Sequence, residues 1–133
     1  MPLRIIFMGT AEWACASLKA LLHSGQNQVL AAVTQPDRPK GRDLNAQAPP
    51  VKRMAEGAGL RVFQPESPRE PAFAAELAAL QPEVMVVAAY GQILPQAVLD
   101  LPRFGCVNVH ASLLPKYRGA APIAWVILNN EAE

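Results

Sequence analysis

The chain has 133 residues, of which 51% are hydrophobic and 17% are charged, a size and composition typical of one globular domain. Twelve Lys and Arg residues face eleven Asp and Glu residues, so the formal net charge is +1. This balance argues neither for nor against binding of nucleic acid, because any basic surface would have to be local.

The sequence shows no pattern typical of an exported, membrane-bound or metal-binding protein. The longest uninterrupted apolar run covers only residues 84–90, far below the ~20 residues that span a bilayer. Cys15 and Cys106 are remote from each other, and the two histidines do not cluster with them. We therefore expect reduced thiols in a cytoplasmic protein, with no membrane contact and no metal site.

Short apolar runs alternate with segments of helical spacing. In chain order, the pattern predicts a strand at 3–8, a helix at 12–23, a strand at 29–34, a long loop at 35–50, a helix at 51–58, a strand at 60–63, a helix at 72–80, a strand at 84–89, a helix at about 95–101, a strand at 106–110 and the opening of a helix at 123–128. The expected strands are continuous apolar runs, which favours an α/β, Rossmann-like fold: a mostly parallel sheet with helices on both faces.

Sheets of this kind bind ligands beyond the carboxyl ends of their strands. After the first expected strand the chain has Gly9 alone, without the G-x-G-x-x-G spacing of dinucleotide sites, and it has no G-x-x-x-x-G-K-[ST]. Both absences argue against nicotinamide and nucleotide enzymes. A tight turn from strand to helix accounts for Gly9, and Thr10 is a candidate helix N-cap.

Two polar residues end the last expected strand. Residues two apart in a strand point to the same face, ~6–7 Å apart along the chain, so Asn108 and His110 share the face of Cys106, while Val107 and Val109 face the other way. The pair either serves a site or satisfies local backbone groups. No G-x-S-x-G surrounds Ser112, which argues against a nucleophilic serine.

Two loops have unusual compositions. Leu113, Leu114 and Pro115 form an apolar loop that either walls a pocket for a flat aromatic ligand or plugs the core. Residues 35–53 contain five basic and two acidic side chains, a local net charge of +3. This loop suits contact with nucleic-acid phosphates, although an ordinary solvated loop remains the alternative. Its charged residues are Arg38, Lys40, Arg42, Lys52 and Arg53 with Asp37 and Asp43.

These stretches together resemble the folate-dependent formyltransferase family. The motif "NVHASLLP" is shared across that family, whereas "QPDRPKGR" and "YGQILP" are similar to its methionyl-tRNA formyltransferase branch. The resemblance implies transfer of a formyl group from 10-formyltetrahydrofolate to the amino group of methionyl initiator tRNA. It also implies that Asn108 and His110 are catalytic, and that Arg38, Lys40 and Arg42 meet the acceptor end of the tRNA. The implied folate-binding residues are Tyr90, Gly91, Ile93, Leu94, Ser112, Leu113, Leu114 and Pro115.

The residue types agree with that chemistry. Attack of an amine on a formyl carbon creates an oxyanion, and an amide donor such as Asn108 is typically worth ~3–4 kcal/mol there. An imidazole such as that of His110 can transfer a proton, an effect worth about 10²–10⁴-fold. The third catalytic group implied by the resemblance is an aspartate on a strand beyond Glu133. We therefore expect residues 1–133 to be a catalytic domain incomplete at its C-terminal end, without the tRNA-binding domain, almost inactive alone and monomeric when full length.

The sequence departs from the resemblance in two places. Ala11 stands where proline is usual, and Asp43-Leu44-Asn45 stand where lysines are common, which weakens the expected role of that loop. The alternatives are a formyltransferase for a small amine, such as a nucleotide sugar or glycinamide ribonucleotide, and a non-catalytic folate-binding remnant.

Overall fold

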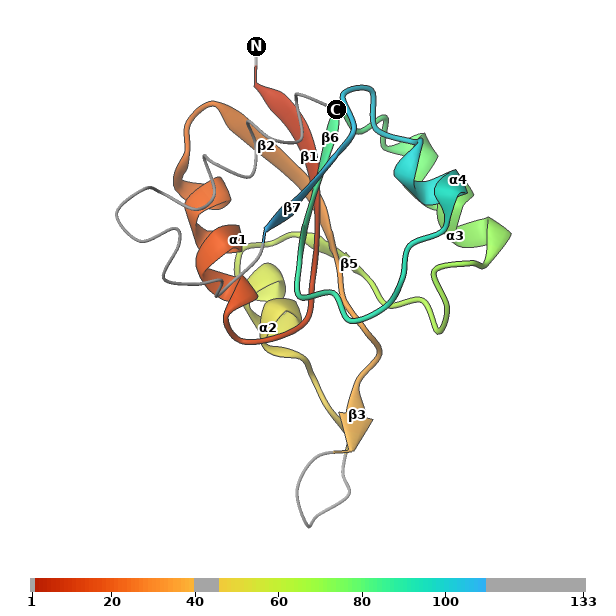
Figure 1. Cartoon of the computed structure of the whole chain (residues 1–133). Coiled ribbons are helices and arrows are strands. Elements are labelled where there is room, and N and C mark those ends of the chain that lie inside the picture. Colours follow the sequence, from red (N-terminus) through yellow and green to blue (C-terminus); the bar gives the residue numbers. More distant parts are fainter. Residues whose placement is uncertain (1, 40–45, 110–133) are drawn as a thin grey trace, which may run out of the picture.

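A computed structural model of the chain describes residues 2–39 and 46–109. The elements in this part, shown in Figure 1, are β1 (Leu3–Gly9), α1 (Ala14–His23), β2 (Asn27–Val33), β3 (Arg38–Pro39), β4 (Ala46–Gln47), α2 (Pro50–Gly57), β5 (Arg61–Phe63), α3 (Pro71–Ala79), β6 (Val84–Ala88), α4 (Gln96–Leu99) and β7 (Cys106–Val109). The predicted order of strands and helices is confirmed up to residue 109, except that β3 and β4 lie in the segment predicted as a loop. The helix expected at 123–128 lies outside the described residues.

Five of the seven described strands form a parallel sheet in the order β5-β2-β1-β6-β7. From β1 the chain builds outward through β2 to β5, and then returns to place β6 on the other side of β1. The strand order therefore reverses between β1 and β6. Ligands of open α/β sheets bind outside the carboxyl ends of the strands at such a switch point, which makes this edge the first place to look for a site.

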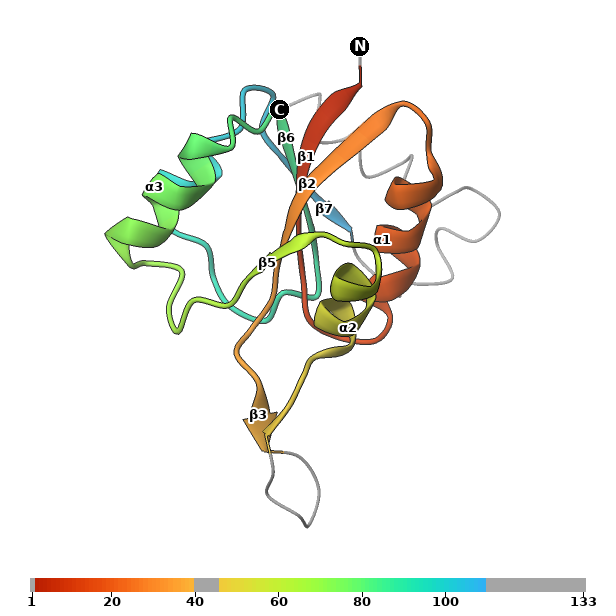
Figure 2. The ribbon, with the colours of Figure 1, turned by 180° about the vertical axis from the view of Figure 1, so that it is seen from behind.

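Helices cover both faces of the sheet, as predicted. α1 and α2 pack on one face, and α3 and α4 pack on the other (Figures 1 and 2). Alternate residues of β1 separate the two cores, because Ile5 and Phe7 face α1 and α2 while Ile6 and Met8 face α3 and α4. A strand buried on both faces reads as a continuous apolar run, which is why periodicity alone located it.

The segment predicted as a long loop contains an additional short antiparallel pair. Arg38 pairs with Gln47 and Pro39 with Ala46, joining β3 and β4. This pair projects beyond the carboxyl end of the sheet (Figure 1). The basic residue Arg38 is thereby held at the same end of the molecule as the switch point.

The amino end of the sheet is closed by structural contacts. The backbone N–H of Arg4 donates to Glu83 Oε1 at 2.9 Å, and its guanidinium donates to the carbonyls of Leu80 and Gln81. These carbonyls follow α3, where a cation also complements the helix dipole. Arg4 therefore satisfies the end of α3 instead of serving a ligand. No helix in the described part of the chain is long and apolar enough to cross a bilayer.

Gly9 has a packing role that differs from the turn suggested by the sequence. An added Cβ at Gly9 would lie 2.7 Å from the carbonyl oxygen of Ala88 and 2.8 Å from Cε2 of Phe7. The absent side chain therefore allows β1 to pass close to β6. The prediction that Thr10 caps the next helix is wrong, because Trp13 occupies the N-cap without a side-chain hydrogen bond.

Replacing Gly9 with alanine is expected to lower the free energy of unfolding by about 1–3 kcal/mol, the usual cost of overpacking, because a backbone carbonyl has to move. Urea unfolding measures the change. Gly25→Ala is the matched control, since a Cβ there meets nothing within 4 Å. A Gly9→Ala variant that unfolds at the same urea concentration as the parent would contradict this packing role.

Candidate functional site

Three segments of the chain meet at the carboxyl edge of the sheet. Thr10 follows β1, Gln35 lies two residues beyond β2, and Tyr90 lies two residues beyond β6. The carbonyl oxygen of Tyr90 accepts hydrogen bonds from Thr10 Oγ1 at 2.8 Å and from Gln35 Nε2 at 2.9 Å. Thr10 Oγ1 in turn accepts the backbone N–H of Gln35 at 3.2 Å. The ends of β1, β2 and β6 are thus fixed to one another at the switch point.

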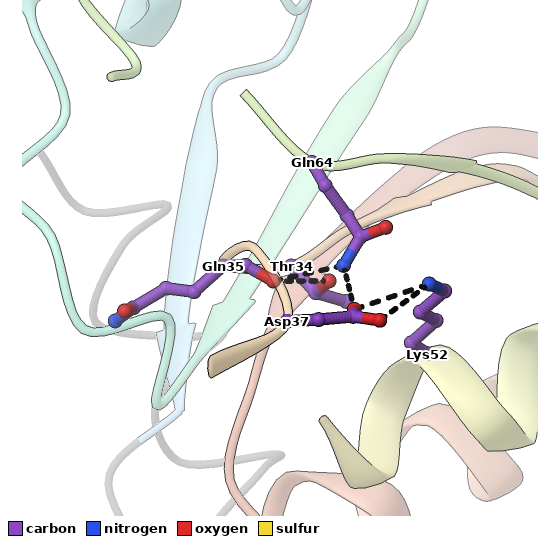
Figure 3. Close-up of polar contacts among 5 residues, drawn as sticks. All are labelled: Thr34, Gln35, Asp37, Lys52 and Gln64. Atoms are coloured by element: carbon purple, nitrogen blue, oxygen red, sulfur yellow. Dashed lines mark hydrogen bonds and ion pairs between the residues drawn. The ribbon is translucent and has the colours of Figure 1, made fainter. Parts of the chain in front are cut away.

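A second group of polar contacts continues from the backbone of Gln35 toward α2, as Figure 3 shows. Gln64 Nε2 donates to the Gln35 carbonyl at 3.1 Å and to Asp37 Oδ1 at 2.7 Å. Lys52 Nζ of α2 pairs with Asp37 at 3.1 Å. The side chain of Gln35 points away from this group, toward its contact with Tyr90.

The carboxylate of Asp37 is exposed but well bonded. The hydrogen bond from Gln64, with the hydrogen bond and charge of Lys52, lowers the pKa of Asp37 from 3.8. Because Lys52 is paired with Asp37, its ammonium group is less available to bind an anionic ligand. Among the described residues, Arg38 and Arg53 form no ion pair.

A hollow of about 190 Å³ lies beside these contacts. Its lining includes Thr10, Gln35, Arg38, Pro39, Pro49 and Arg53. The hollow therefore combines two guanidinium groups with polar side chains and apolar proline rings. Such a surface suits an anionic, partly apolar ligand.

The predicted donor-binding residues after β6 differ in how far their side chains are exposed to a ligand. The Tyr90 side chain is only 2% exposed within the core beside α3 and α4, and burial raises the pKa of Tyr90 to about 12. Leu94 packs partly against the same core, whereas Ile93 is 83% exposed. Gly91 has φ +93°, and a Cβ there would collide with Gln35 Nε2. A ligand at this segment would meet the Ile93 side chain and the backbone, not the Tyr90 ring.

The strand β7 presents Asn108 as the sequence predicted. Asn108 lies opposite Val87 of β6 and is exposed, while Val109 is 8% exposed in the core on the α1 and α2 face. Cys106 packs against the other core, where burial, with a smaller contribution from Asp100, raises the pKa of its thiol to about 11. Cys106 is therefore a protonated packing residue, and Asn108 is the polar group that this strand offers.

Several predicted site residues lie outside the described residues: Lys40, Arg42, His110, Ser112, Leu113, Leu114 and Pro115. Their roles stay predictions. Sequence reasoning missed Thr10, Gln35 and Gln64 as parts of the site. The available signal was that Thr10, Gln35 and Gln64 each follow an apolar strand within two residues. No group of three or more His, Cys, Asp or Glu side chains in residues 2–39 and 46–109 is arranged to hold a metal ion.

Comparison with known proteins identifies the class. The chain matches the Formyl transferase family over residues 3–133 and belongs to that family. The solved structures it resembles include glycinamide ribonucleotide transformylase 1 from Symbiobacterium toebii, with TM-score 0.59, 21% identity, and coverage of 96% of this chain and 60% of that one. Another is formyltetrahydrofolate deformylase from Pseudomonas syringae pv. tomato, with TM-score 0.59, 24% identity, and coverage of 97% and 42%. These likenesses confirm the Rossmann-like fold.

Relatives that are similar in sequence show which members of the family this chain resembles. The chain is 55% identical over 131 residues to the methionyl-tRNA formyltransferase of Citrifermentans bemidjiense, covering 98% of this chain and 41% of the relative. It is 58% identical over 132 residues to the methionyl-tRNA formyltransferase of Caldanaerobacter subterraneus subsp. tengcongensis, covering 98% and 42%. The family resemblance inferred from the motifs is confirmed. The chain spans less than half the length of these relatives.

The pKa of Asp37 offers a test of the contacts in Figure 3. Because the pKa is lowered in the folded protein, the contribution of Asp37 to stability is present above the unfolded-state pKa of 3.8 and is lost as the pH falls through the lower, folded value. Gln64→Ala should raise the pKa of Asp37 toward 3.8, as followed by carboxyl-carbon NMR titration. Gln96→Ala, which removes a glutamine bonded to Asp100 instead, should leave it unchanged. An unaltered Asp37 titration in Gln64→Ala would rule out the Gln64 bond as the main cause.

Proposed function

We propose that this chain carries the donor site and part of the catalytic group of an enzyme that transfers a formyl group from 10-formyltetrahydrofolate to the amino group of methionyl initiator tRNA. The observation that carries the proposal is the exposed amide of Asn108 on β7, at the carboxyl edge beside the strand that leads into Tyr90 and Gly91. The choice of acceptor is supported by relatives that are 55% and 58% identical.

The chemistry requires a donor for the oxyanion of the tetrahedral intermediate. The side-chain N–H of Asn108 stays a donor at any physiological pH, because an amide does not titrate there. In this proposal His110, two residues further along the chain, takes the proton released by the attacking amine. The carboxylate that orients its imidazole is supplied by an aspartate after residue 133.

The donor binds along the segment from Tyr90 to Leu94. Ile93 offers an exposed apolar side chain for the flat ring system of the folate, as do Leu113, Leu114 and Pro115 by prediction, with Ser112 beside them. Edges of the ring bond to backbone groups, since aromatic ligand pockets are mostly apolar with a few placed polar groups.

The acceptor approaches from β3 and the segment that follows it. Arg38 is exposed at the carboxyl edge, and Lys40 and Arg42 continue the basic run. The guanidinium groups of Arg38 and Arg53 beside the hollow suit the phosphates of a nucleic-acid end. We place this reaction in the cytoplasm and expect the full-length enzyme to act as a monomer.

A chimeric enzyme tests the proposal: this chain replaces the matching 132 residues of the Caldanaerobacter enzyme. With 10-formyltetrahydrofolate as donor, we expect formylation of methionyl initiator tRNA and none of glycinamide ribonucleotide. Asn108→Ala should lower kcat by about 10²–10³-fold, the usual loss for one oxyanion donor, with little change in either KM.

Asn27→Ala is the matched control, because Asn27 begins β2 at the opposite edge of the sheet. It should retain the kcat of the parent chimera. A folded chimera that formylates only the small amine would favour the alternative acceptor. A folded chimera whose Asn108→Ala variant keeps full activity would overturn the catalytic role.

A further inference from the structure

We propose that Gln35 is a positioning residue that sets the donor-binding segment and the basic acceptor-binding segment relative to each other through its one carboxamide. This inference rests on the proposed function and deepens it. The carboxamide donates from Nε2 to the Tyr90 carbonyl at 2.9 Å and accepts at Oε1 from Arg38 Nε at 3.3 Å. One planar group thus joins the start of the segment from Tyr90 to Leu94 to the first residue of β3.

The two contacts require a carboxamide in one orientation. A carbonyl oxygen only accepts hydrogen bonds and a guanidinium only donates them. Nε2 therefore has to face Tyr90, and Oε1 has to face Arg38. A carboxylate at this position could serve Arg38 alone, and an alkyl side chain could serve neither.

Gly91 is a second, independent sign that the segment is built around this side chain. A Cβ at Gly91 would collide with Gln35 Nε2, and its φ of +93° is also unfavourable for other residues. The backbone after Tyr90 therefore leaves room for the Gln35 amide. A Cβ at this position would instead push the Gln35 amide away from the Tyr90 carbonyl.

The backbone of Gln35 is anchored separately from its side chain. Its N–H donates to Thr10 Oγ1, and its carbonyl accepts from Thr34 Oγ1 at 3.0 Å and from Gln64 Nε2 at 3.1 Å. The Tyr90 carbonyl also keeps its bond from Thr10 when the Gln35 amide is removed. Substitution of the side chain should therefore release the link without leaving a buried backbone group unbonded or unfolding the domain.

Relative placement of two substrates is what a two-substrate transfer depends on. The attacking amine has to reach the formyl carbon within ~3–3.5 Å and in line, so misplacement by ~1 Å lowers the rate strongly. Arg38 lies on the acceptor side and Gly91 on the donor side in the proposed reaction. A side chain that bonds both segments therefore affects binding of both substrates.

The test compares Gln35→Ala, Gln35→Glu and Arg38→Ala in the chimeric enzyme, with KM measured for each substrate. Gln35→Ala should lower kcat, because the two substrates are no longer held in line, and should raise the KM for 10-formyltetrahydrofolate and the KM for methionyl initiator tRNA, each by roughly 3- to 10-fold, as the loss of one net hydrogen bond implies. Gln35→Glu should raise the donor KM only, since a carboxylate keeps Arg38 but repels the Tyr90 carbonyl. Arg38→Ala should raise the acceptor KM only.

Gln28→Ala is the matched control, because Gln28 is an exposed glutamine of the same strand β2, and it should change neither KM. The proposal is overturned if Gln35→Ala lowers only the melting temperature with both KM values unchanged, or if Gln35→Glu raises both KM values as Gln35→Ala does.

Hydrogen exchange of the 133-residue chain separates this proposal from the proposed function. Gln35→Ala should speed exchange in 90–94 and at the amides of Asp37 and Arg38, since Pro36 and Pro39 have none, whereas Gln64→Ala should not speed exchange in 90–94. If the parent chimera transfers no formyl group, the proposed function fails, and this exchange pattern still decides whether Gln35 links the segments. Unchanged exchange in 90–94 in Gln35→Ala overturns the link.

Discussion

The carbonyl oxygen of Tyr90 holds the functional edge of this domain together. It accepts bonds from Thr10, after β1, and from Gln35, after β2, at the point where the strand order reverses. A buried carbonyl with two donors keeps a hydrogen bond when one donor is lost. The Tyr90 carbonyl would therefore stay bonded to Thr10 if the Gln35 amide were removed. The junction fixes the start of the segment that contains the exposed Ile93.

The two ends of the sheet contrast in chemistry. At the amino end the Arg4 guanidinium donates to the carbonyls of Leu80 and Gln81 after α3, and the Arg4 backbone N–H donates to Glu83. At the carboxyl end Lys52 is paired with Asp37, while Arg38 and Arg53 line a hollow without an ion pair in the described part of the chain. Exposed apolar, amide and guanidinium groups therefore lie at one edge, which is the combination that the proposed folate donor and anionic acceptor would require.

Local pattern was enough for the framework of the fold. Continuous apolar runs identified β1, β2 and β6, and the period of two correctly placed Asn108 on the exposed face of β7 with Val109 in the core. The family resemblance, based on motifs such as "NVHASLLP", is confirmed by the match over residues 3–133. The roles of His110 and of the residues after it stay predictions.

Contacts between distant residues could not be predicted in this way. Thr10 meets Tyr90 across 80 positions and Gln35 meets Tyr90 across 55, and no periodicity connects such pairs. Thr10 therefore looked like a helix cap, and Gly9 like a turn, although the close passage of β1 and β6 is what Gly9 permits. Gln35 looked like the start of a polar loop because its partner Tyr90 is distant in the sequence. The two residues come together only because β2 and β6 lie on either side of β1 in the sheet.

Hydrogen exchange of the chimeric enzyme, with and without a non-reactive analogue of 10-formyltetrahydrofolate, tests the location of the donor site most directly. We predict slower exchange on binding in residues 90–94 and 106–109, and unchanged exchange in 2–4, 81–83 and 103–105 at the amino edge. Slower exchange at the amino edge, with none at 90–94, would contradict the assignment of the donor site to the switch point between β1 and β6.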